Sequence, residues 1–178
     1  MGLAVELYFD ARTEDTITAL RDAVHDAGIE ASPRLTGSRP HISLALVKTE
    51  DVPLLGGVVT EFARESGSCH LRLGALSSFA SEQGVLYLAP VPTIGLLEIH
   101  SRLHEHLKSR GLESDPLYRP GAWVPHCTIE MGLSGSQLAA AFDACWVDFT
   151  PIDGRLVAAG VVSYPPPRCH FVTPLQGA

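Results

Sequence analysis

Two stretches of the chain, Arg39-Pro40-His41-Ile42-Ser43-Leu44 and Val124-Pro125-His126-Cys127-Thr128-Ile129, follow the same pattern, Pro-His-x-[Ser/Thr]-aliphatic. We call them the first and second histidine motifs; their histidines lie 85 positions apart. Both motifs sit in apolar, β-branched surroundings that predict strands. Because side chains alternate between the faces of a strand, His41 shares a face with Ser43, and His126 with Thr128. Each strand therefore presents an imidazole, which can move a proton near neutral pH, beside a hydroxyl that can bind an anion.

The repetition of the motif is what indicates a functional site, because a single copy could arise by chance. With 8 His and 46% hydrophobic residues in the chain, random order would produce about half of one His-x-[Ser/Thr]-hydrophobic match. Two copies, each preceded by a proline and each within a predicted strand, favour a shared site. The alternative is that both are ordinary strand histidines hydrogen-bonded into the core.

The segments around the motifs predict an alternation of strands and helices. Asp51 and Pro53 mark the start of one helix, Ser136 is expected to cap another, and the motifs themselves begin strands, the first continuing through Val47. Further strands are expected at 3–9, 69–79 and 85–91, with two or three in the tail 149–172, and further helices from Thr13 to Gly28, from Pro92 to about Arg110, and at 137–146.

This order predicts an α+β fold built from two similar halves. We expect a single bilobal domain over residues 1–178, with pseudo-repeat halves at about 1–78 and 79–178, each with the order strand-helix-strand-helix. The halves would form two lobes with antiparallel sheets around a central cleft. Packing about a pseudo-twofold axis would set the two motif strands next to each other, with both His-hydroxyl pairs facing the cleft.

Composition narrows the class of protein. A hydrophobic fraction of 46% and a charged fraction of 19% are typical of a globular domain. The net charge of −7 argues against a long nucleic-acid ligand, which needs many cationic contacts to phosphates. The absence of a signal-like or membrane-length apolar segment predicts a soluble, cytoplasmic protein, which we expect to be a monomer. The four cysteines, at 69, 127, 145 and 169, show no C-x-x-C pairing and are expected to be reduced.

Two histidines facing each other across a cleft suit the cleavage of a phosphodiester. One neutral imidazole can accept a proton while a second, protonated imidazole donates one, and the neighbouring hydroxyls can hold the non-bridging phosphate oxygens. Metal-dependent phosphoryl transfer would call for clustered carboxylates. No Asp or Glu stands inside either motif, so we expect neither a metal nor another cofactor.

The paired motifs, their spacing and the element order resemble those of the 2H phosphoesterases, which include 2′-5′ RNA ligase-like proteins and cyclic nucleotide phosphodiesterases. The resemblance covers most of the chain. It implies that His41 and His126 form the acid/base pair and that Ser43 and Thr128 hold the phosphate, without assigning acid and base. Ser43 stands where Thr is commoner in the family, and Cys127 fills a variable position expected to point away from the cleft.

The implied reaction is the opening of a 2′,3′-cyclic phosphate, or a related cyclic phosphodiester, to a monophosphate by water. Weak 2′-5′ RNA ligation would be its reverse. Family members that act on tRNA would be expected to carry a basic surface, so the acidic balance of this chain favours a small cyclic nucleotide, an oligonucleotide or an RNA 3′ end as partner.

Five further residues are candidates for binding the substrate. Phe79, Tyr118 and Trp123 lie in or beside loops next to the predicted cleft and could stack on a base, although each could equally be a packing aromatic. Arg39 and Arg119 could steer the phosphate, although surface arginines are common.

Two alternative functions remain open. The first is a non-catalytic module that binds a nucleotide or an RNA end in the same cleft. The second is a metal-dependent hydrolase that uses His100, His104 and His106, because residues four apart share a helix face. On a helical wheel His100 falls within the apolar stripe of the helix while His104 and His106 flank it on opposite sides. The three histidines therefore do not converge, and histidines on the helix surface are the favoured interpretation.

Overall fold

The computed structural model describes residues 2–178, and over these residues it is an α+β protein with four α-helices packed on a seven-stranded antiparallel sheet. The predicted α+β class is confirmed. The elements in chain order are β1 (Gly2–Phe9), α1 (Ala11–Asp26), β2 (His41–Val47), α2 (Val52–Glu65), β3 (Cys69–Ser78), β4 (Val85–Pro90), α3 (Ile94–Ser109), the 3-10 turn η1 (Pro116–Tyr118), β5 (Cys127–Met131), α4 (Gly135–Trp146), β6 (Ile152–Tyr164) and β7 (Arg168–Pro174).

Two helices begin earlier than the sequence predicts. The carboxylate of Asp10 accepts hydrogen bonds from both the backbone N–H (3.0 Å) and the hydroxyl (2.8 Å) of Thr13, so α1 starts two residues before Thr13. For α4 the cap is Ser134, not Ser136, because Ser134 and Gln137 exchange side-chain-to-backbone bonds in a capping box. In both cases the better-placed acceptor fixes the first turn.

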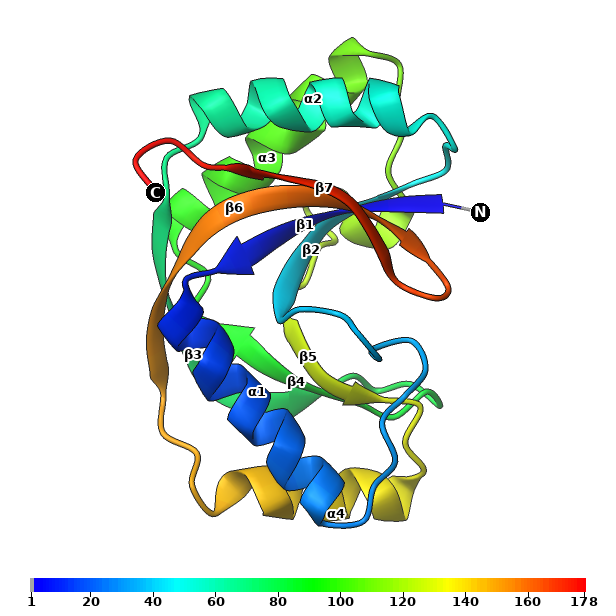
Figure 1. Ribbon diagram of the computed structural model, residues 1–178, viewed down its shortest axis with the longest axis vertical. Helices are drawn as coiled ribbons and strands as arrows, with labels where there is room; N and C mark the ends of the chain where they lie inside the picture. Colours follow the sequence, from blue (N-terminus) through cyan, green and yellow to red (C-terminus); the bar gives the residue numbers. More distant parts are fainter. Residues whose placement is uncertain (1) are drawn as a thin grey trace.

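The sheet is continuous through both lobes. Its strand order is β2-β1-β6-β3-β4-β5, and β7 also pairs with β6. The strand β6 joins the lobes, because residues 152–156 pair with β3 while residues 156–164 pair with β1. Figure 1 shows β6 curving along one side of the molecule from the lower lobe to the upper one. The antiparallel sheets expected for the two lobes are thus two parts of one continuous hydrogen-bonded sheet.

The order strand-helix-strand-helix occurs twice, as β1-α1-β2-α2 and as β4-α3-β5-α4. In each set the first strand pairs antiparallel with the strand that carries a histidine motif. Each helix packs against a helix of the other set: α1 packs against α4 in the lower lobe, and α3 packs against α2 in the upper lobe, as Figure 1 shows. The division of the chain near residue 78 stays a prediction.

The core lies where the apolar stripes of the helices meet the sheet. Ile17 and Val24 of α1 and Leu103 of α3 are completely buried, as their helical spacing indicates. In α2, Gly56 lets β7 approach closely, because a Cβ there would lie 3.1 Å from the ring of Phe171. Within residues 2–178, no helix has both the length and the apolar character needed to cross a membrane.

Candidate two-histidine site

The fold brings the two histidine motifs together from opposite ends of the sheet. The strands β2 and β5 are the first and last in the strand order, so they are not hydrogen-bonded neighbours. They nevertheless contact each other because the sheet curves round between them, as Figure 1 shows near its centre. The motif strands are therefore close in space without being hydrogen-bonded to each other, and they meet where each strand begins. Cys127 is fully buried and belongs to the hydrophobic core, so its side chain points into the core, as expected.

The two imidazoles are held in the same way. Nδ1 of His41 lies 2.8 Å from the carbonyl oxygen of Arg39, and Nδ1 of His126 lies 2.7 Å from that of Val124. A carbonyl oxygen can only accept a hydrogen bond, so Nδ1 carries the proton in both rings. In each motif this leaves Nε2 as the atom that can accept or donate a proton elsewhere.

Ser43 and Thr128 follow their histidines by two positions, and both are partly exposed. Ser43 lies in β2 with His41, whereas His126 directly precedes β5, the strand of Thr128. Their backbone carbonyls are anchored: Ser43 accepts a hydrogen bond from the Trp123 indole (3.0 Å), and Thr128 accepts one from Arg21 (2.8 Å). The backbone that carries each hydroxyl is therefore bonded to a distant segment of the chain. Each motif thus presents an imidazole Nε2 and a nearby hydroxyl, the arrangement that the strand alternation predicts.

The surroundings of the two rings differ. His41 is 8% exposed, and its Nε2 lies 3.4 Å from a carboxylate oxygen of Glu6. His126 lies instead among aromatic rings, edge-on to Phe79 at 4.9 Å and to Tyr87 at 5.5 Å. Burial, together with the nearby charge of His41, lowers the pKa of His126 below its usual 6.5. The two histidines thus make the same backbone contact, but a carboxylate lies beside His41 and aromatic rings lie beside His126.

The two candidate arginines are already engaged with protein groups. The Arg39 guanidinium lies over the ring of Tyr8, 4.5 Å from its centroid, and pairs with Glu14 at 2.6 Å. Arg119 donates to the carbonyl of Ser114 and pairs with a neighbouring glutamate. Both residues lie near the motifs, and in this structure their charges are directed at protein acceptors.

The three candidate aromatics have different positions. Phe79 stacks on Tyr87 at 4.4 Å and closes one side of the His126 ring. Trp123 is fixed, since its indole bonds to Ser43 and its ring stacks parallel on His100 at 4.0 Å. Tyr118 lies in η1, and burial, followed by the charges of Asp115 and Glu6, raises the pKa of its hydroxyl.

The helical wheel is confirmed for His100, which lies in the buried stripe of α3, so the interpretation as a surface histidine is wrong for this residue; His104 is partly buried. His100 is buried, bonds to the carbonyl of Tyr118 at 2.8 Å, and has its pKa lowered to about 4 by burial. His104 bonds to the carbonyl of Leu44 at 3.3 Å, so these two rings link α3 to η1 and β2. His106 points elsewhere, toward Glu65. Over residues 2–178 no group of three or more His, Cys, Asp or Glu is arranged to hold a metal.

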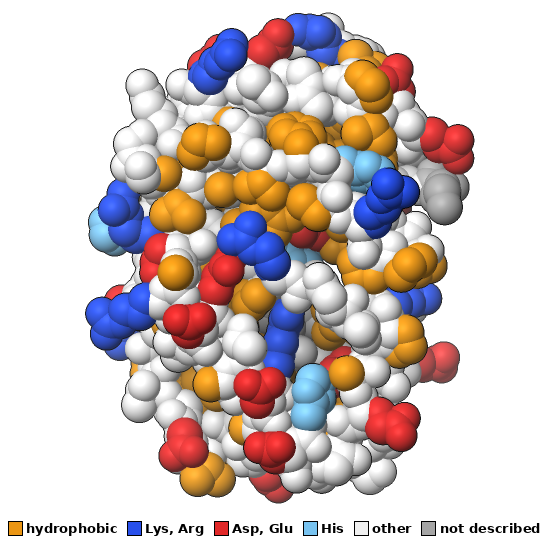
Figure 2. Space-filling model, in the orientation of Figure 1, with side chains coloured by type: hydrophobic (Ala, Val, Ile, Leu, Met, Phe, Trp, Pro, Cys, Tyr) orange, Lys and Arg blue, Asp and Glu red, His pale blue; other side chains and the backbone are white. Residues whose placement is uncertain are grey.

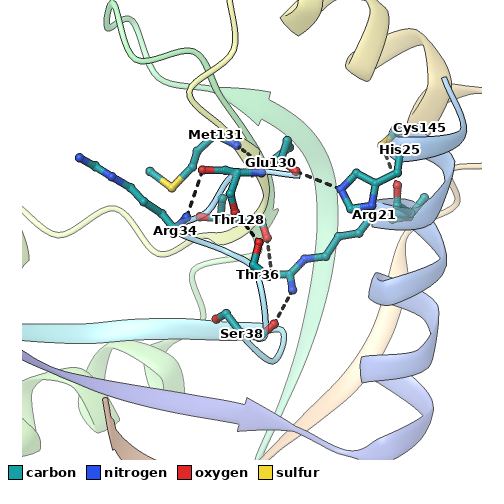
Figure 3. A network of polar contacts seen from close by, with 11 residues as sticks. Arg21, His25, Arg34, Thr36, Ser38, Thr128, Glu130, Met131 and Cys145 are labelled. Atoms are coloured by element: carbon teal, nitrogen blue, oxygen red, sulfur yellow. Dashed lines mark hydrogen bonds and ion pairs between the residues drawn. The ribbon is translucent and has the colours of Figure 1, made fainter. Parts of the chain in front are cut away.

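Arg21 of α1 connects the two motifs directly and was not anticipated from the sequence. It is 9% exposed. One guanidinium nitrogen donates to the carbonyl of Ser38, three residues before His41, and the other to the carbonyl of Thr128, each at 2.8 Å. Figure 3 shows this side chain reaching from α1 to both segments. Arg21 thus sets the separation between the approach to the first motif and the strand of the second.

A buried carboxylate, Glu130 of β5, fixes the loop before the first motif. It is 1% exposed and pairs with His25 of α1 at 3.1 Å. Its other oxygen accepts the backbone N–H groups of Ser32 (3.1 Å) and Met131 (2.9 Å), so the loop is tied to β5 (Figure 3). Together with Arg21, this residue makes the loop before His41 part of the framework of the site.

Comparison with known proteins identifies the family. The sequence model of the 2′-5′ RNA ligase superfamily matches residues 7–165. The chain therefore belongs to this superfamily, that of the 2H phosphoesterases. A protein of Bacillus licheniformis named "Putative phosphoesterase" is 30% identical over 101 residues, which are 55% of this chain and 56% of that protein. The match thus spans only about half the length of this relative.

Solved structures share the fold at low sequence identity. TT0787 of Thermus thermophilus superposes with a TM-score of 0.68 at 15% identity, covering 99% of each chain. LigT of E. coli in complex with 3′-AMP gives 0.62 at 17% identity, covering 98% of this chain and 94% of LigT. LigT has also been crystallised with ATP and with NADP+. These similarities confirm the fold.

Proposed function

We propose that this protein is a metal-independent phosphoesterase that opens a cyclic phosphodiester, such as a 2′,3′-cyclic phosphate, to a monophosphate. The observation that carries the proposal is the matched pair of imidazoles, each with Nδ1 bonded to a backbone carbonyl and each followed two positions later by a hydroxyl residue. Membership of the 2H phosphoesterase superfamily supports the same reaction class.

In the proposed reaction, each histidine has one task. His126, whose lowered pKa keeps it neutral at pH 7, accepts a proton at Nε2 from water as the water oxygen bonds to phosphorus. The bond from phosphorus to one ribose oxygen breaks, and that oxygen takes the proton from Nε2 of His41. Ser43 and Thr128 donate hydrogen bonds to the non-bridging oxygens. One proton has been gained by His126 and one lost by His41, and exchange with solvent restores both.

The substrate we favour is a small cyclic nucleotide, an oligonucleotide or an RNA 3′ end. Figure 2 shows that on the face it presents, Lys and Arg side chains are interspersed with Asp and Glu and form no continuous basic patch. The net charge of −7 points the same way, because long nucleic acids are bound through many cationic contacts. The small nucleotides bound to LigT support this choice by analogy.

A panel of cyclic phosphates tests the proposed activity. We expect the protein, dialysed against a strong chelator, to convert at least one 2′,3′-cyclic nucleotide to a monophosphate, followed by phosphorus NMR, which also identifies the 2′- or 3′-product. Retention of full activity after chelation is expected because acid/base transfer by imidazole needs no metal. Activity that disappears with the chelator and returns with a divalent ion would contradict the mechanism.

The pH profile of kcat/KM gives a second test. His126 must be neutral to accept a proton, and its pKa is lowered by burial and by the charge of His41. Lowering the pKa of a base extends the neutral form to lower pH, so the acidic limb of the profile is expected below the usual imidazole value of 6.5. Rates measured in constant-ionic-strength buffers over the acidic to mildly alkaline range locate the limb. An acidic limb above 6.5 would argue against His126 as the base.

The alternative is a module that binds nucleotides without turnover, and the engagement of Arg39 and Arg119 with protein acceptors is the observation that favours it. Tight binding of a 2′,3′-cyclic nucleotide by calorimetry, with no monophosphate after hours at micromolar protein, would select this alternative.

A further inference from the structure

Glu6 is a buried carboxylate in an otherwise apolar strand. It is 2% exposed and belongs to β1, between Val5 and Leu7. The hydroxyl of Tyr8 donates to one of its oxygens at 2.9 Å, and the hydroxyl of Tyr164, at the end of β6, donates to the other. A carboxylate that accepts a donor at each oxygen is held in one orientation.

The strand register places this carboxylate at the first histidine motif. In the antiparallel pair of β1 and β2, Tyr8 lies opposite His41 and Glu6 lies opposite Ser43. One oxygen of Glu6 is consequently 3.4 Å from Nε2 of His41. The site also needs room on the neighbouring strand: a Cβ at position 160 would lie 2.7 Å from the ring of Tyr8, so the glycine there permits the tyrosine to reach Glu6.

The ring nitrogen that lies near Glu6 is Nε2. The proton on Nδ1 is committed to the carbonyl of Arg39, so Nε2 is the atom whose proton the nearby Glu6 oxygen can influence. In a buried site a carboxylate oxygen attracts a protonated nitrogen and repels the lone pair of an unprotonated one. At 3.4 Å the contact is longer than an ordinary hydrogen bond, so the Nε2 proton remains free to go to a closer acceptor.

The second half lacks this group. Tyr87 of β4 corresponds to Glu6 of β1, since Glu6 lies opposite Ser43 and Tyr87 lies opposite Thr128. The position that carries a carboxylate in the first half thus carries a tyrosine in the second. The ring of His126 instead contacts Phe79 and Tyr87. The pseudo-symmetry of the site is therefore broken by one carboxylate.

We propose that Glu6, held by Tyr8 and Tyr164, is a positioning residue whose carboxylate beside Nε2 makes His41 the proton donor and leaves His126 as the proton acceptor. The proposal rests on the proposed function for its catalytic consequence, but its electrostatic part concerns the free protein. Glu6 acts through His41 and does not touch the reacting atoms.

Other ionisable groups near His41 and Glu6 come from several elements and do not replace this carboxylate. The loop before β2 contributes Arg39, which is paired with Glu14 of α1. The remaining neighbours are the hydroxyls of Tyr8 on β1, Tyr164 on β6 and Tyr118 in η1, the imidazole of His126 on β5, and the Arg21 guanidinium, which is bonded to backbone carbonyls. Burial and the charge of Glu6 raise the pKa of both Tyr8 and Tyr164, so both hydroxyls stay neutral donors at pH 7.

The decisive experiment is a titration of the ring signals of His41 by NMR in the parent protein and in Glu6→Gln, without substrate. Glutamine keeps the size of the side chain but has no charge; its amide oxygen can accept from one tyrosine hydroxyl, and its NH2 group can donate to the oxygen of the other. Loss of a carboxylate at this distance is expected to lower the pH at which His41 loses its proton by about one unit or more. The same midpoint in both proteins would overturn the proposal.

Two further variants separate charge from structure. In Glu6→Asp the charge is retained at a greater distance, and a titration midpoint between those of the parent and Glu6→Gln is expected. In Glu130→Gln an equally buried carboxylate, paired with His25 and not with His41, is neutralised. The His41 midpoint should then stay unchanged; a shift of equal size would show that any loss of buried charge produces the effect and would overturn the assignment to Glu6.

Activity supplies an independent readout. The alkaline limb of kcat/KM, where the proton donor is lost, is expected to move to lower pH in Glu6→Gln by the shift seen in the NMR titration, while the acidic limb moves little. If the His41 midpoint shifts but no protein, parent included, opens a cyclic phosphate, the proposed function fails and the electrostatic role of Glu6 stands. If the parent is active and the limbs do not follow the NMR shift, the catalytic role of Glu6 fails.

Discussion

Replacing His126 with alanine is expected to lower kcat for a 2′,3′-cyclic phosphate by a factor of about 10² to 10⁴, the usual contribution of one positioned acid or base. His41→Ala is expected to produce a loss of the same order. The reason is that each ring supplies one of the two proton transfers, and Nε2 is the atom left for transfer once Nδ1 is bonded to its backbone carbonyl. Initial rates by phosphorus NMR or a coupled phosphatase assay measure the effect.

A matched control is available in α3. His106 pairs with Glu65 on the helix surface, away from both motifs. His106→Ala should therefore leave kcat unchanged, and thermal melting should show all three variants to be folded. The double variant His41→Ala/His126→Ala should be little worse than either single one, because residues that act as a unit are not additive. Activity at the parent level in either single variant would exclude the two-histidine mechanism.

Arg21→Met is expected to weaken both the fold and the activity. The substitution keeps an unbranched side chain but leaves the carbonyls of Ser38 and Thr128 without their charged donor. An unpaired buried carbonyl costs about 1 to 3 kcal/mol, and removal of a buried charge offsets part of this, so we expect the free energy of unfolding to fall by about 2 kcal/mol. Since the two motifs are no longer held at a set distance, kcat should fall by about 10- to 100-fold.

The control for this prediction is an arginine with surface contacts alone. Arg110 pairs with Glu61 and is largely exposed. Arg110→Met should change the free energy of unfolding by less than about 0.5 kcal/mol and leave kcat as it is. Urea titration and steady-state rates measure both quantities. If Arg21→Met behaves like Arg110→Met, Arg21 does not set the geometry of the site.

The helices and strands could be predicted because each has a local cause. The spacing of Ile17, Leu20 and Val24 marks the buried side of α1, and all three are buried in the structure. Boundaries were less accurate, since the sequence predicts helix starts at Thr13 and Ser136 where the structure has the caps Asp10 and Ser134. Several residues near a helix start can cap it, and the one that does so depends on where the chain enters the helix.

Two buried carboxylates have a signal in the sequence that could have marked them. Glu6 lies in the apolar run from Leu3 to Phe9, and Glu130 lies between Ile129 and Met131. A charge within a strand that is otherwise apolar is buried only if it has partners, so both positions could have been singled out. Their partners, however, include residues 98 and 158 positions away, and no local pattern identifies them.

The sequence by itself determined the α+β class, the repeated strand-helix order and the two histidine motifs, because periodicity, capping residues and strand alternation act within a few neighbouring residues. Only the tertiary structure decided that the motif strands meet from opposite ends of one curved sheet, that Arg21 joins them, and that Glu6 lies beside His41 while Tyr87 occupies the matching place in the other half. These contacts depend on how a long strand, β6, bends through both lobes, and hydrogen bonding and packing across the whole chain set that curvature.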